Sequence, residues 1–194
     1  IFAEENGLRS PISEGSVWVI DPIDGTNNFV TQKEDFAVMV AYFEDGIGQF
    51  GLIYDVMRDH LFYGGGEFPV YRNEVQLTHF VDHPLENLLI ASNVGMLEKN
   101  DWGMADLGMD SLGIRVYGSA GISFSKILSG GILAYFCYIW PWDYAAAAIM
   151  GERLGYTVLN LNGDKPNYQT VEPIMMVPKV KLTEIQTYLK KGRS

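Results

Sequence analysis

The feature that most constrains the fold is a series of short apolar segments joined by tight turns in the first half of the chain. Between two of these segments, Glu44-Asp45-Gly46 has the composition of a hairpin turn, and Gly64-Gly65-Gly66 forms a later turn. Consecutive strands with such short connections predict an antiparallel meander. The expected strands are Val17 to Ile20, Phe36 to Phe43, Gln49 to Tyr54, His60 to Tyr63 and Val70 to Arg72.

The pattern changes near Pro84, after which expected strands and helices alternate, as in a layered α/β unit. The expected strands are Leu88 to Ala91, Ile114 to Tyr117, Ile132 to Cys137, Tyr156 to Leu159 and Ile174 to Val177. The expected helices are Trp102 to Leu112, Ser119 to Leu128, Asp143 to Leu154 and Leu182 to Leu189. The sequence therefore predicts two halves packed on each other: an antiparallel-sheet half, residues 1–84, and an α/β half, residues 85–194.

The amino-acid composition and net charge limit the kinds of molecule that this protein can be expected to bind. Of the 194 residues, 47% are hydrophobic, which is enough for a globular core, and the formal net charge is −10. An acidic surface argues against nucleic acid and anionic membranes, so we expect a small metabolite as the partner. The one cysteine, Cys137, cannot form an internal disulfide, and we see neither a membrane-spanning stretch nor a signal peptide. These features predict a cytoplasmic protein.

The stretch Asp21-Pro22-Ile23-Asp24-Gly25-Thr26 carries the main chemical signal. Pro22 lacks an amide hydrogen, so we expect the preceding strand to end there and the turn to aim Asp21 and Asp24 to one side. Carboxylate and carbonyl oxygens are the ligands of hard cations such as Mg²⁺. Backbone N–H groups and the hydroxyl at Gly25 and Thr26 suit a phosphate or the water that attacks it.

Three other interpretations use similar residues. A calcium EF-hand loop is excluded, because it needs ligands at alternate positions and glycine at the sixth. A phosphatase that forms an aspartyl phosphate fits poorly, because its acids are two residues apart. A turn with two solvated aspartates is the ordinary explanation of an isolated motif of this kind.

The motif is not isolated. The segment from Trp18 to Phe29, WVIDPIDGTNNF, resembles the signature of the inositol monophosphatase family, and Trp142-Asp143-Tyr144-Ala145-Ala146 resembles that family's second signature. Ala3-Glu4-Glu5 is similar to its upstream acidic pair, and Gly118-Ser119-Ala120 fits between the two signatures. The resemblance covers essentially the whole chain.

The resemblance implies a fold: a layered α-β-α-β-α sandwich of the sugar-phosphatase type, with an antiparallel N-terminal sheet and a mixed C-terminal sheet. This chain begins three residues before Glu4, so we expect the first helical layer to be missing and an apolar face to be exposed. The layer includes an aspartate that assists the water-orienting threonine.

The resemblance also implies a magnesium-dependent phosphatase with two or three Mg²⁺ ions, inhibited by lithium and commonly a homodimer. Glu4, Asp21 and the Ile23 carbonyl are expected to hold one ion, and Asp21, Asp24 and Asp143 a second; a third also contacts Glu4. Metal-bound water attacks the phosphate monoester directly, with Thr26 orienting it and two ions lying about 3.5–4 Å apart. Substrate is expected to contact Asp24, Gly25, Thr26, Gly118, Ser119 and Ala120.

Two of these residues have a structural alternative. An aspartate at a helix start, as expected for Asp143, is a good N-cap. Ser119 precedes an expected helix and is equally suited to capping it, whereas the resemblance places the Ala120 backbone against the substrate alcohol. Capping and function therefore both remain open for these positions.

The substrate is less defined than the chemistry. The inositol-specific member has a hydroxyl-binding glutamate seven residues before the second-signature aspartate, where this chain has Phe136 or a near neighbour. The alternatives are a nucleotide-type substrate (NADP or 3′-phosphoadenosine 5′-phosphate), fructose 1,6-bisphosphate, or an inactive metal-binding relative that acts through a partner. Tyr138 and Trp140 suit either a larger leaving group or core packing.

Overall fold

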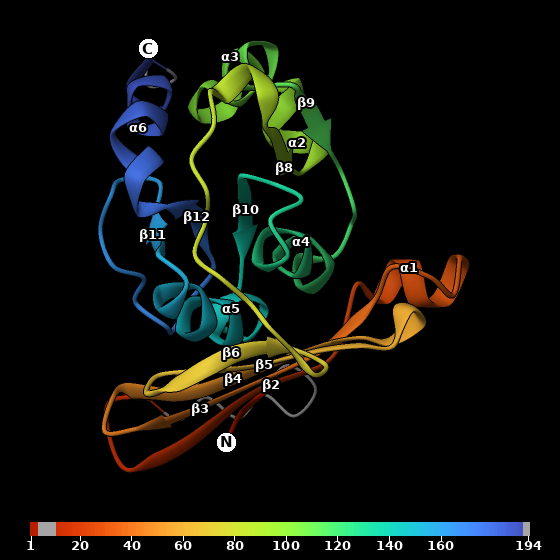
Figure 1. Ribbon diagram of the computed structural model, residues 1–194, viewed down its shortest axis with the longest axis vertical. Coiled ribbons are helices and arrows are strands. Elements are labelled where there is room, and N and C mark those ends of the chain that lie inside the picture. Colours follow the sequence, from red (N-terminus) through yellow and green to blue (C-terminus); the bar gives the residue numbers. More distant parts are fainter. Residues whose placement is uncertain (4–10, 192–194) are drawn as a thin grey trace.

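The computed structural model describes residues 1–3 and 11–191 (Figure 1). Its first sheet has seven strands in the order β1-β2-β3-β4-β5-β6-β7, with every neighbouring pair antiparallel except β1 and β2. The predicted meander is confirmed. The strands are β1 Phe2–Ala3, β2 Ser16–Asp24, β3 Ala37–Glu44, β4 Ile47–Asp55, β5 His60–Gly65, β6 Phe68–Arg72 and β7 Val75–Gln76.

The second sheet has five strands in the order β11-β12-β10-β8-β9 and is mixed. Strand β10 pairs in parallel with β8 and antiparallel with β12, so the predicted mixed C-terminal sheet is also confirmed. The strands are β8 Leu89–Ser92, β9 Gly113–Arg115, β10 Ala134–Ile139, β11 Tyr156–Asn160 and β12 Glu172–Pro178.

Helices separate the two sheets and cover the second one. In Figure 1, α4 and α5 lie between the sheets, whereas α2, α3 and α6 lie on the far side of the second sheet. The helices are α1 Thr26–Thr31, α2 Val94–Glu98, α3 Met104–Asp110, α4 Ala120–Leu128, α5 Pro141–Arg153 and α6 Leu182–Lys191, with 3-10 turns at Val56–Arg58, Leu85–Asn87, Asp101–Gly103 and Lys179–Lys181. The predicted layered α/β architecture is confirmed. None of the described helices is long and apolar enough to cross a membrane.

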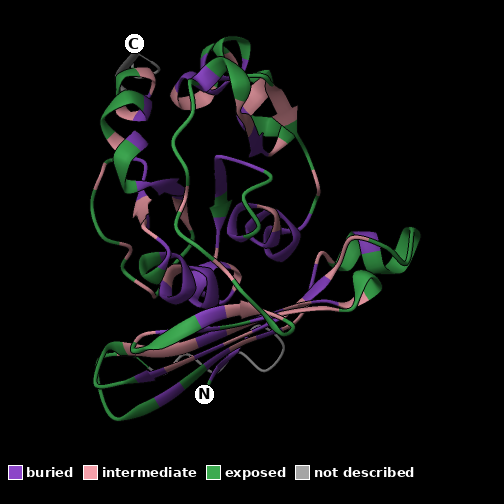
Figure 2. Ribbon diagram, in the orientation of Figure 1, coloured by how far each residue is buried: buried purple, intermediate pink, exposed green. Residues whose placement is uncertain are grey.

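Helix α5 approaches the first sheet closely because small residues face each other. Ala145, Ala146 and Ala147 are buried, and a Cβ added at Gly51 on β4 lies 2.4 Å from the Ala146 carbonyl oxygen. Figure 2 shows α4 and α5 mostly buried between the two sheets. This packing fixes the start of α5 relative to β2, which the site requires.

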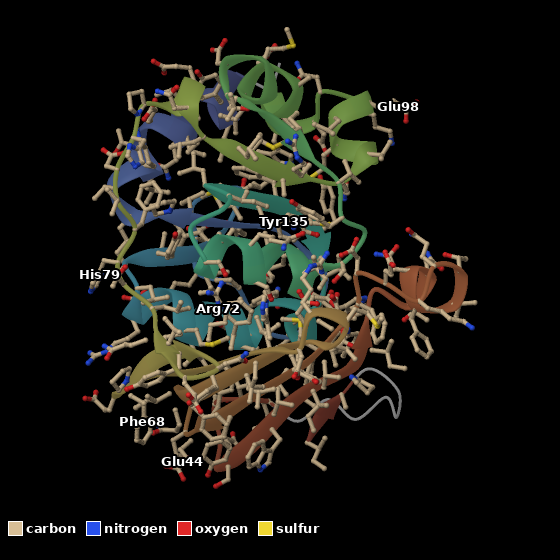
Figure 3. All side chains as sticks on the ribbon, turned by 45° about the vertical axis from the view of Figure 1, so that its right-hand side comes forward. Glu44, Phe68, Arg72, His79, Glu98 and Tyr135 are labelled. Carbon is tan, nitrogen blue, oxygen red and sulfur yellow. The ribbon has the colours of Figure 1, made fainter. Side chains whose placement is uncertain are left out.

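The opposite face of the first sheet is apolar as well. Trp18, Tyr42 and Phe50 form an aromatic cluster there, with Trp18 ring centroids 4.7 Å from Tyr42 and 5.6 Å from Phe50. Tyr63 stacks on Tyr71 at 5.6 Å, and Figure 3 shows Phe68 at the outer edge of the same sheet. Within residues 1–3 and 11–191 no helix packs on this face.

Several boundaries differ from the sequence predictions. Strand β2 does not end at Pro22 but continues to Asp24, because a bulge skips the pairing of Pro22 and Ile23 with β3 and no proline N–H is needed. Helix α5 begins at Pro141 rather than Asp143, since proline is suited to the first helical turn. The expected helix Trp102 to Leu112 is interrupted, because Trp102 and Gly103 both have left-handed backbone angles.

Candidate metal centre and substrate pocket

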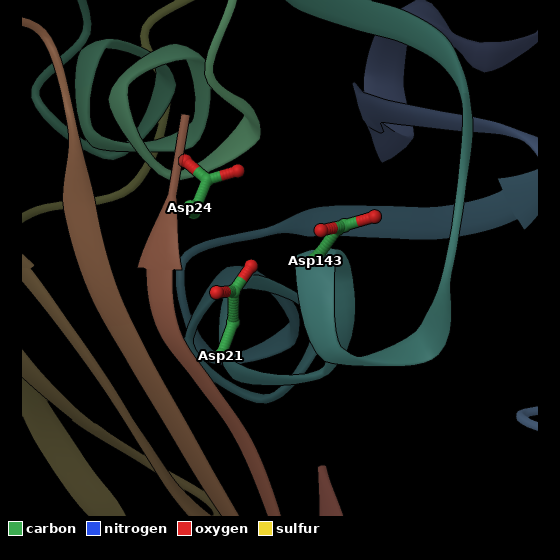
Figure 4. A group of neighbouring side chains, drawn as sticks. All are labelled: Asp21, Asp24 and Asp143. Carbon is green, nitrogen blue, oxygen red and sulfur yellow. The ribbon is translucent and has the colours of Figure 1, made fainter. Parts of the chain in front are cut away.

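Three aspartates from the two sequence motifs meet between β2 and α5. One carboxylate oxygen each from Asp21, Asp24 and Asp143 lies within 4.8 Å of the others (Figure 4). Asp21 and Asp24 lie at the end of β2, and Asp143 lies in the first turn of α5. Residues separated by more than a hundred positions in sequence thus form one cluster.

The bulge in β2 explains why Asp21 and Asp24 point to the same place. In a regular strand, residues three apart point to opposite faces. Here Asp21 pairs with Met39 and Asp24 with Ala37, so two residues of β2 lie opposite Val38 alone. Asp21 is 1% exposed and Asp24 6% exposed, and the Ile23 N–H donates to Asp21 Oδ1 at 3.0 Å.

The N-terminus of α4 holds the Asp24 carboxylate. The Ala120 N–H donates to Asp24 Oδ1 at 3.0 Å, the Gly121 N–H donates to Oδ2 at 2.8 Å, and the Ser119 hydroxyl donates to Oδ2. Ser119 Oγ also accepts from the Ile122 N–H at 3.1 Å, so Ser119 is the N-cap of α4. The capping alternative for Ser119 is confirmed, and its hydroxyl and the Ala120 N–H are directed to a candidate metal ligand.

Asp143 also stabilises the start of its own helix. It is the third residue of α5, not the N-cap, and its Oδ2 accepts the Trp140 N–H at 2.8 Å. Burial, followed by repulsion from Asp24 and Asp21, raises the pKa of Asp143 well above its usual value. Three carboxylates with all-oxygen chemistry, crowded in a buried place, fit a bound hard cation that removes this repulsion.

The turn that follows Asp24 carries the next predicted residues, Gly25 and Thr26. Thr26 Oγ1 donates to the Ile23 carbonyl at 3.0 Å, which places the hydroxyl beside a predicted metal-ligand oxygen. Gly25 has φ +83°, and a Cβ there lies 2.9 Å from Ser119 Cβ, so the turn requires glycine. Glu4 lies outside the described residues.

A pocket of about 270 Å³ opens beside Asp24 and Asp143. The predicted Gly118, Ser119 and Ala120 line it, as do residues that the sequence analysis did not assign to the site. Those unassigned residues are Ser92, Asn93, Val116, Tyr117, Tyr135, Cys137 and Ile139.

Of the two options given for the position of the hydroxyl-binding glutamate, Phe136 or a near neighbour, only the near neighbours line the pocket. Phe136 is fully buried in the core between the second sheet and its outer helices, whereas the neighbours Tyr135 and Cys137 line the pocket. Successive side chains of a strand point to opposite faces, so Phe136 faces the core while Tyr135 and Cys137 face the pocket. The alternation along β10 could have identified Cys137 as a pocket residue from the sequence, if the register of the strand had been known.

The chain matches the model of the inositol monophosphatase family over residues 1–192. It is 36% identical over 170 residues to inositol-1-monophosphatase of Bacillus subtilis strain 168, a match that covers 84% of this chain but only 64% of that protein. A crystal structure of SaIMPase-II with inositol monophosphate superimposes with a TM-score of 0.90 at 31% identity, covering 98% of this chain and 76% of that one. The structure of an IMPase/NADP phosphatase with Mg²⁺ and phosphate superimposes with a TM-score of 0.87 at 25% identity. This match covers 96% of the present chain and 71% of that protein.

The structural matches agree with the layered fold described above. The chain belongs to the inositol monophosphatase family.

Proposed function

We propose that this chain hydrolyses a small phosphate monoester in a magnesium-dependent reaction, as an inositol-monophosphatase-like enzyme. The observation that carries the proposal is the meeting of Asp21, Asp24 and Asp143 at the wall of an open pocket. The donor set is entirely oxygen, which favours Mg²⁺ over softer metals. Relatives support the metal and the substrate class, since one family structure contains Mg²⁺ and phosphate and another contains inositol monophosphate.

The residues have distinct roles in this proposal. Asp21, Asp24, Asp143 and the Ile23 carbonyl hold the metal ions, two or three in number, with Glu4 as a further ligand. Bound Mg²⁺ supplies an acidified water and neutralises the phosphoryl charge. The Thr26 hydroxyl orients the attacking water, and the backbone at Gly25 and Thr26 receives the phosphate. The α4 N-terminus fixes Asp24 through three hydrogen bonds, so this ligand is preorganised.

A nucleotide-type phosphatase is the second candidate. It is favoured by the structural likeness to an IMPase/NADP phosphatase and to SaIMPase-II with bound 2′-AMP, each with a TM-score of at least 0.87. Fructose 1,6-bisphosphate and an inactive metal-binding relative are further alternatives from the sequence.

The test is phosphate release from a substrate panel with and without Mg²⁺. The panel contains inositol 1-phosphate, 2′-AMP, NADP, 3′-phosphoadenosine 5′-phosphate and fructose 1,6-bisphosphate, and the protein includes whatever residues precede Ile1 in its gene. We expect Mg²⁺-dependent release from at least one monoester. Release from none of them contradicts the enzyme proposal and leaves the inactive relative as the explanation.

Three further expectations accompany the proposal: inhibition by Li⁺ competing for a metal position, a homodimer, and a cytoplasmic location. Phosphate release in the presence of Li⁺ and the mass measured by light scattering test the first two. Insensitivity to Li⁺ counts against close kinship with lithium-sensitive members but not against phosphatase chemistry.

A further inference from the structure

A second cavity lies along the C-terminal half of α5, away from the three aspartates. It has a volume of about 600 Å³ and is formed by turns of the first sheet, α5, β11 and the loop that follows β11. In Figure 1, the first sheet and β11 lie on opposite sides of α5. Ile149 and Glu152 line the cavity from the second half of α5, whereas Asp143 lies in the first turn. Among the described residues, none lines both this cavity and the pocket beside Asp143, so the two are separate.

Three glycines keep this second cavity open. Gly46 in the β3–β4 turn and Gly66 in the β5–β6 turn have φ of +80° and +59°, which favours glycine. Gly48 lies against α5, where an added Cβ would be 2.5 Å from Ile149 Cγ1. All three glycines line the cavity. The space that they leave is therefore built into the turns and into the contact between α5 and the first sheet.

The lining of the cavity is largely apolar and partly aromatic. Phe43 and Ile149 are buried, and Val158 and Tyr168 are half-buried. The Tyr168 ring centroid lies 5.6 Å from that of Phe43, at an interplanar angle of 70°, and 5.2 Å from that of the buried Tyr144. Because these contacts hold the Tyr168 ring in place, the cavity presents a preformed apolar surface. Such a surface suits a ligand with a flat apolar body.

Two positive charges lie at the same cavity. Arg153 and Lys165 both line it and are exposed, and neither forms an ion pair within the described part of the chain. The third charged lining residue, Glu152, is paired with Lys179. Arg153 also complements the C-terminal end of the α5 dipole, but Lys165, in the loop after β11, has no such role. Since the net charge of −10 repels anions overall, two cations without acidic partners distinguish this cavity.

We propose that this cavity is a second ligand site, which binds a small organic anion with a flat apolar body, such as an aromatic carboxylate. The apolar body packs on Phe43 and Tyr168, and the charge of the carboxylate is balanced by Arg153 and Lys165. The volume of about 600 Å³ is within the range of about 300–1,000 Å³ that small-molecule sites occupy. The site shares no residue with the proposed metal centre, so either proposal can fail without the other.

The first experiment measures whether binding depends on the charge of the ligand. The probes are 2-naphthoate and its neutral analogue 2-naphthamide, which have the same flat body, titrated into nitrogen-15-labelled protein that includes whatever residues precede Ile1 in its gene. We expect naphthoate to bind about fivefold more tightly at low salt and to shift the amide signals of Gly46, Gly48 and Gly66. Saturating Mg²⁺ and inorganic phosphate, at constant ionic strength, leave the naphthoate affinity unchanged because they bind elsewhere. Absence of binding, equal affinity for the two probes, or displacement by Mg²⁺ and phosphate overturns the proposal.

The second experiment tests the two cations. Arg153→Gln combined with Lys165→Gln removes both charges, so we expect the naphthoate affinity to fall about fivefold, to that of naphthamide. Lys99→Gln combined with Arg115→Gln is the matched control, because it removes the same charges at exposed positions that do not line the cavity. We expect this control to bind naphthoate as the parent does. An equal loss of affinity in both double variants, or in neither, contradicts the role of Arg153 and Lys165.

The third experiment fills the cavity. Ala148 is half-buried on α5 and lines the cavity, so the large side chain of Ala148→Trp occupies space that the ligand needs. We expect the affinity for both naphthoate and naphthamide to fall at least about tenfold, with an unchanged circular dichroism spectrum. Parent-like binding in this variant shows that the probes bind elsewhere, for example on the exposed aromatic cluster of Trp18, Tyr42 and Phe50, and overturns the proposal.

Discussion

Asn28 and Tyr117, 89 positions apart in the chain, are joined by a hydrogen bond of 2.7 Å from Asn28 Nδ2 to the Tyr117 carbonyl oxygen. The same amide donates to the Asp35 carbonyl at 2.9 Å, and the Asn28 side chain is buried at 8% exposure. Asn28 thereby fastens α1, which begins at Thr26 within the first motif, to the segment that leads into α4. Since α4 holds Asp24 through its N-terminus, Asn28 positions a candidate metal ligand without contacting it.

We predict that Asn28→Asp, which keeps the side-chain shape but removes both amide donors, destabilises the protein by about 1–3 kcal/mol, because the Asp35 and Tyr117 carbonyls, both on half-buried residues, lose their partner. We also predict that the Mg²⁺ concentration for half-maximal activity rises, which a purely structural role does not cause. Thermal unfolding and Mg²⁺ titration of phosphate release measure the two effects. Asn27→Ala, at the neighbouring exposed position, is the matched control, and similar changes in both variants contradict this role.

Ser119 is predicted to matter more than an ordinary helix cap. Ser119→Ala removes the N-cap bond to Ile122 and the hydrogen bond to Asp24, so we expect a loss of about 1–2 kcal/mol in the free energy of unfolding and weaker Mg²⁺ binding. Ser129→Ala, at the other end of α4, removes only a bond to the Ser125 carbonyl and serves as the control. Unchanged Mg²⁺ affinity in Ser119→Ala argues that the serine only caps the helix.

Metal binding is predicted to relieve repulsion among the three carboxylates. In metal-free protein, Asp143→Asn removes one of the crowded charges, so we expect its Tm to be equal to or higher than that of the parent. Addition of Mg²⁺ raises the Tm of the parent by ligand linkage but raises that of the variant much less. Differential scanning calorimetry in EDTA and in Mg²⁺ measures the Tm of both proteins. An equal increase of Tm on addition of Mg²⁺ in the parent and the variant contradicts the prediction.

The close contact between α5 and the first sheet gives a prediction about the fold alone. Gly51→Ala places a Cβ 2.4 Å from the Ala146 carbonyl oxygen, where the backbone must move, so we expect a loss of about 1–3 kcal/mol in unfolding free energy. Gly131→Ala has its nearest neighbour at 3.5 Å and is expected to be nearly neutral. Urea unfolding measures both, and a neutral Gly51→Ala indicates a looser helix–sheet contact.

The sequence predicted the elements whose signals are local. Hairpin turns such as Glu44-Asp45-Gly46 and the periodic apolar residues of α4 identified the meander and a central helix, both confirmed. The bulge after Asp21 was missed, because a proline normally ends a strand and only pairing with β3 shows which residues are skipped. Local patterns could not predict whether Phe136 or Cys137 faces the pocket, because this depends on how β10 pairs with strands distant in sequence.

In the candidate site as well, residues with a local sequence motif were predicted and residues that depend on long-range contacts were not. Asp21, Asp24 and Asp143 were identified from two short motifs, and the structure brings them together. Asn28 lay inside the first motif but gained no role, because its partner Tyr117 is distant in sequence. Asn93 and Tyr135 carried no motif at all, since neutral side chains reveal a pocket wall only when the strands are assembled.

The most direct test of the account is the rate of phosphate release from inositol 1-phosphate as Mg²⁺ is titrated, for the parent protein and for Asp143→Asn. We predict a saturable Mg²⁺ dependence in the parent, and a rate at least about a hundredfold lower in the variant at every Mg²⁺ concentration, with an unchanged circular dichroism spectrum. A parent rate that persists in EDTA, or a variant with parent-like turnover, contradicts the assignment of the three aspartates to a catalytic metal centre.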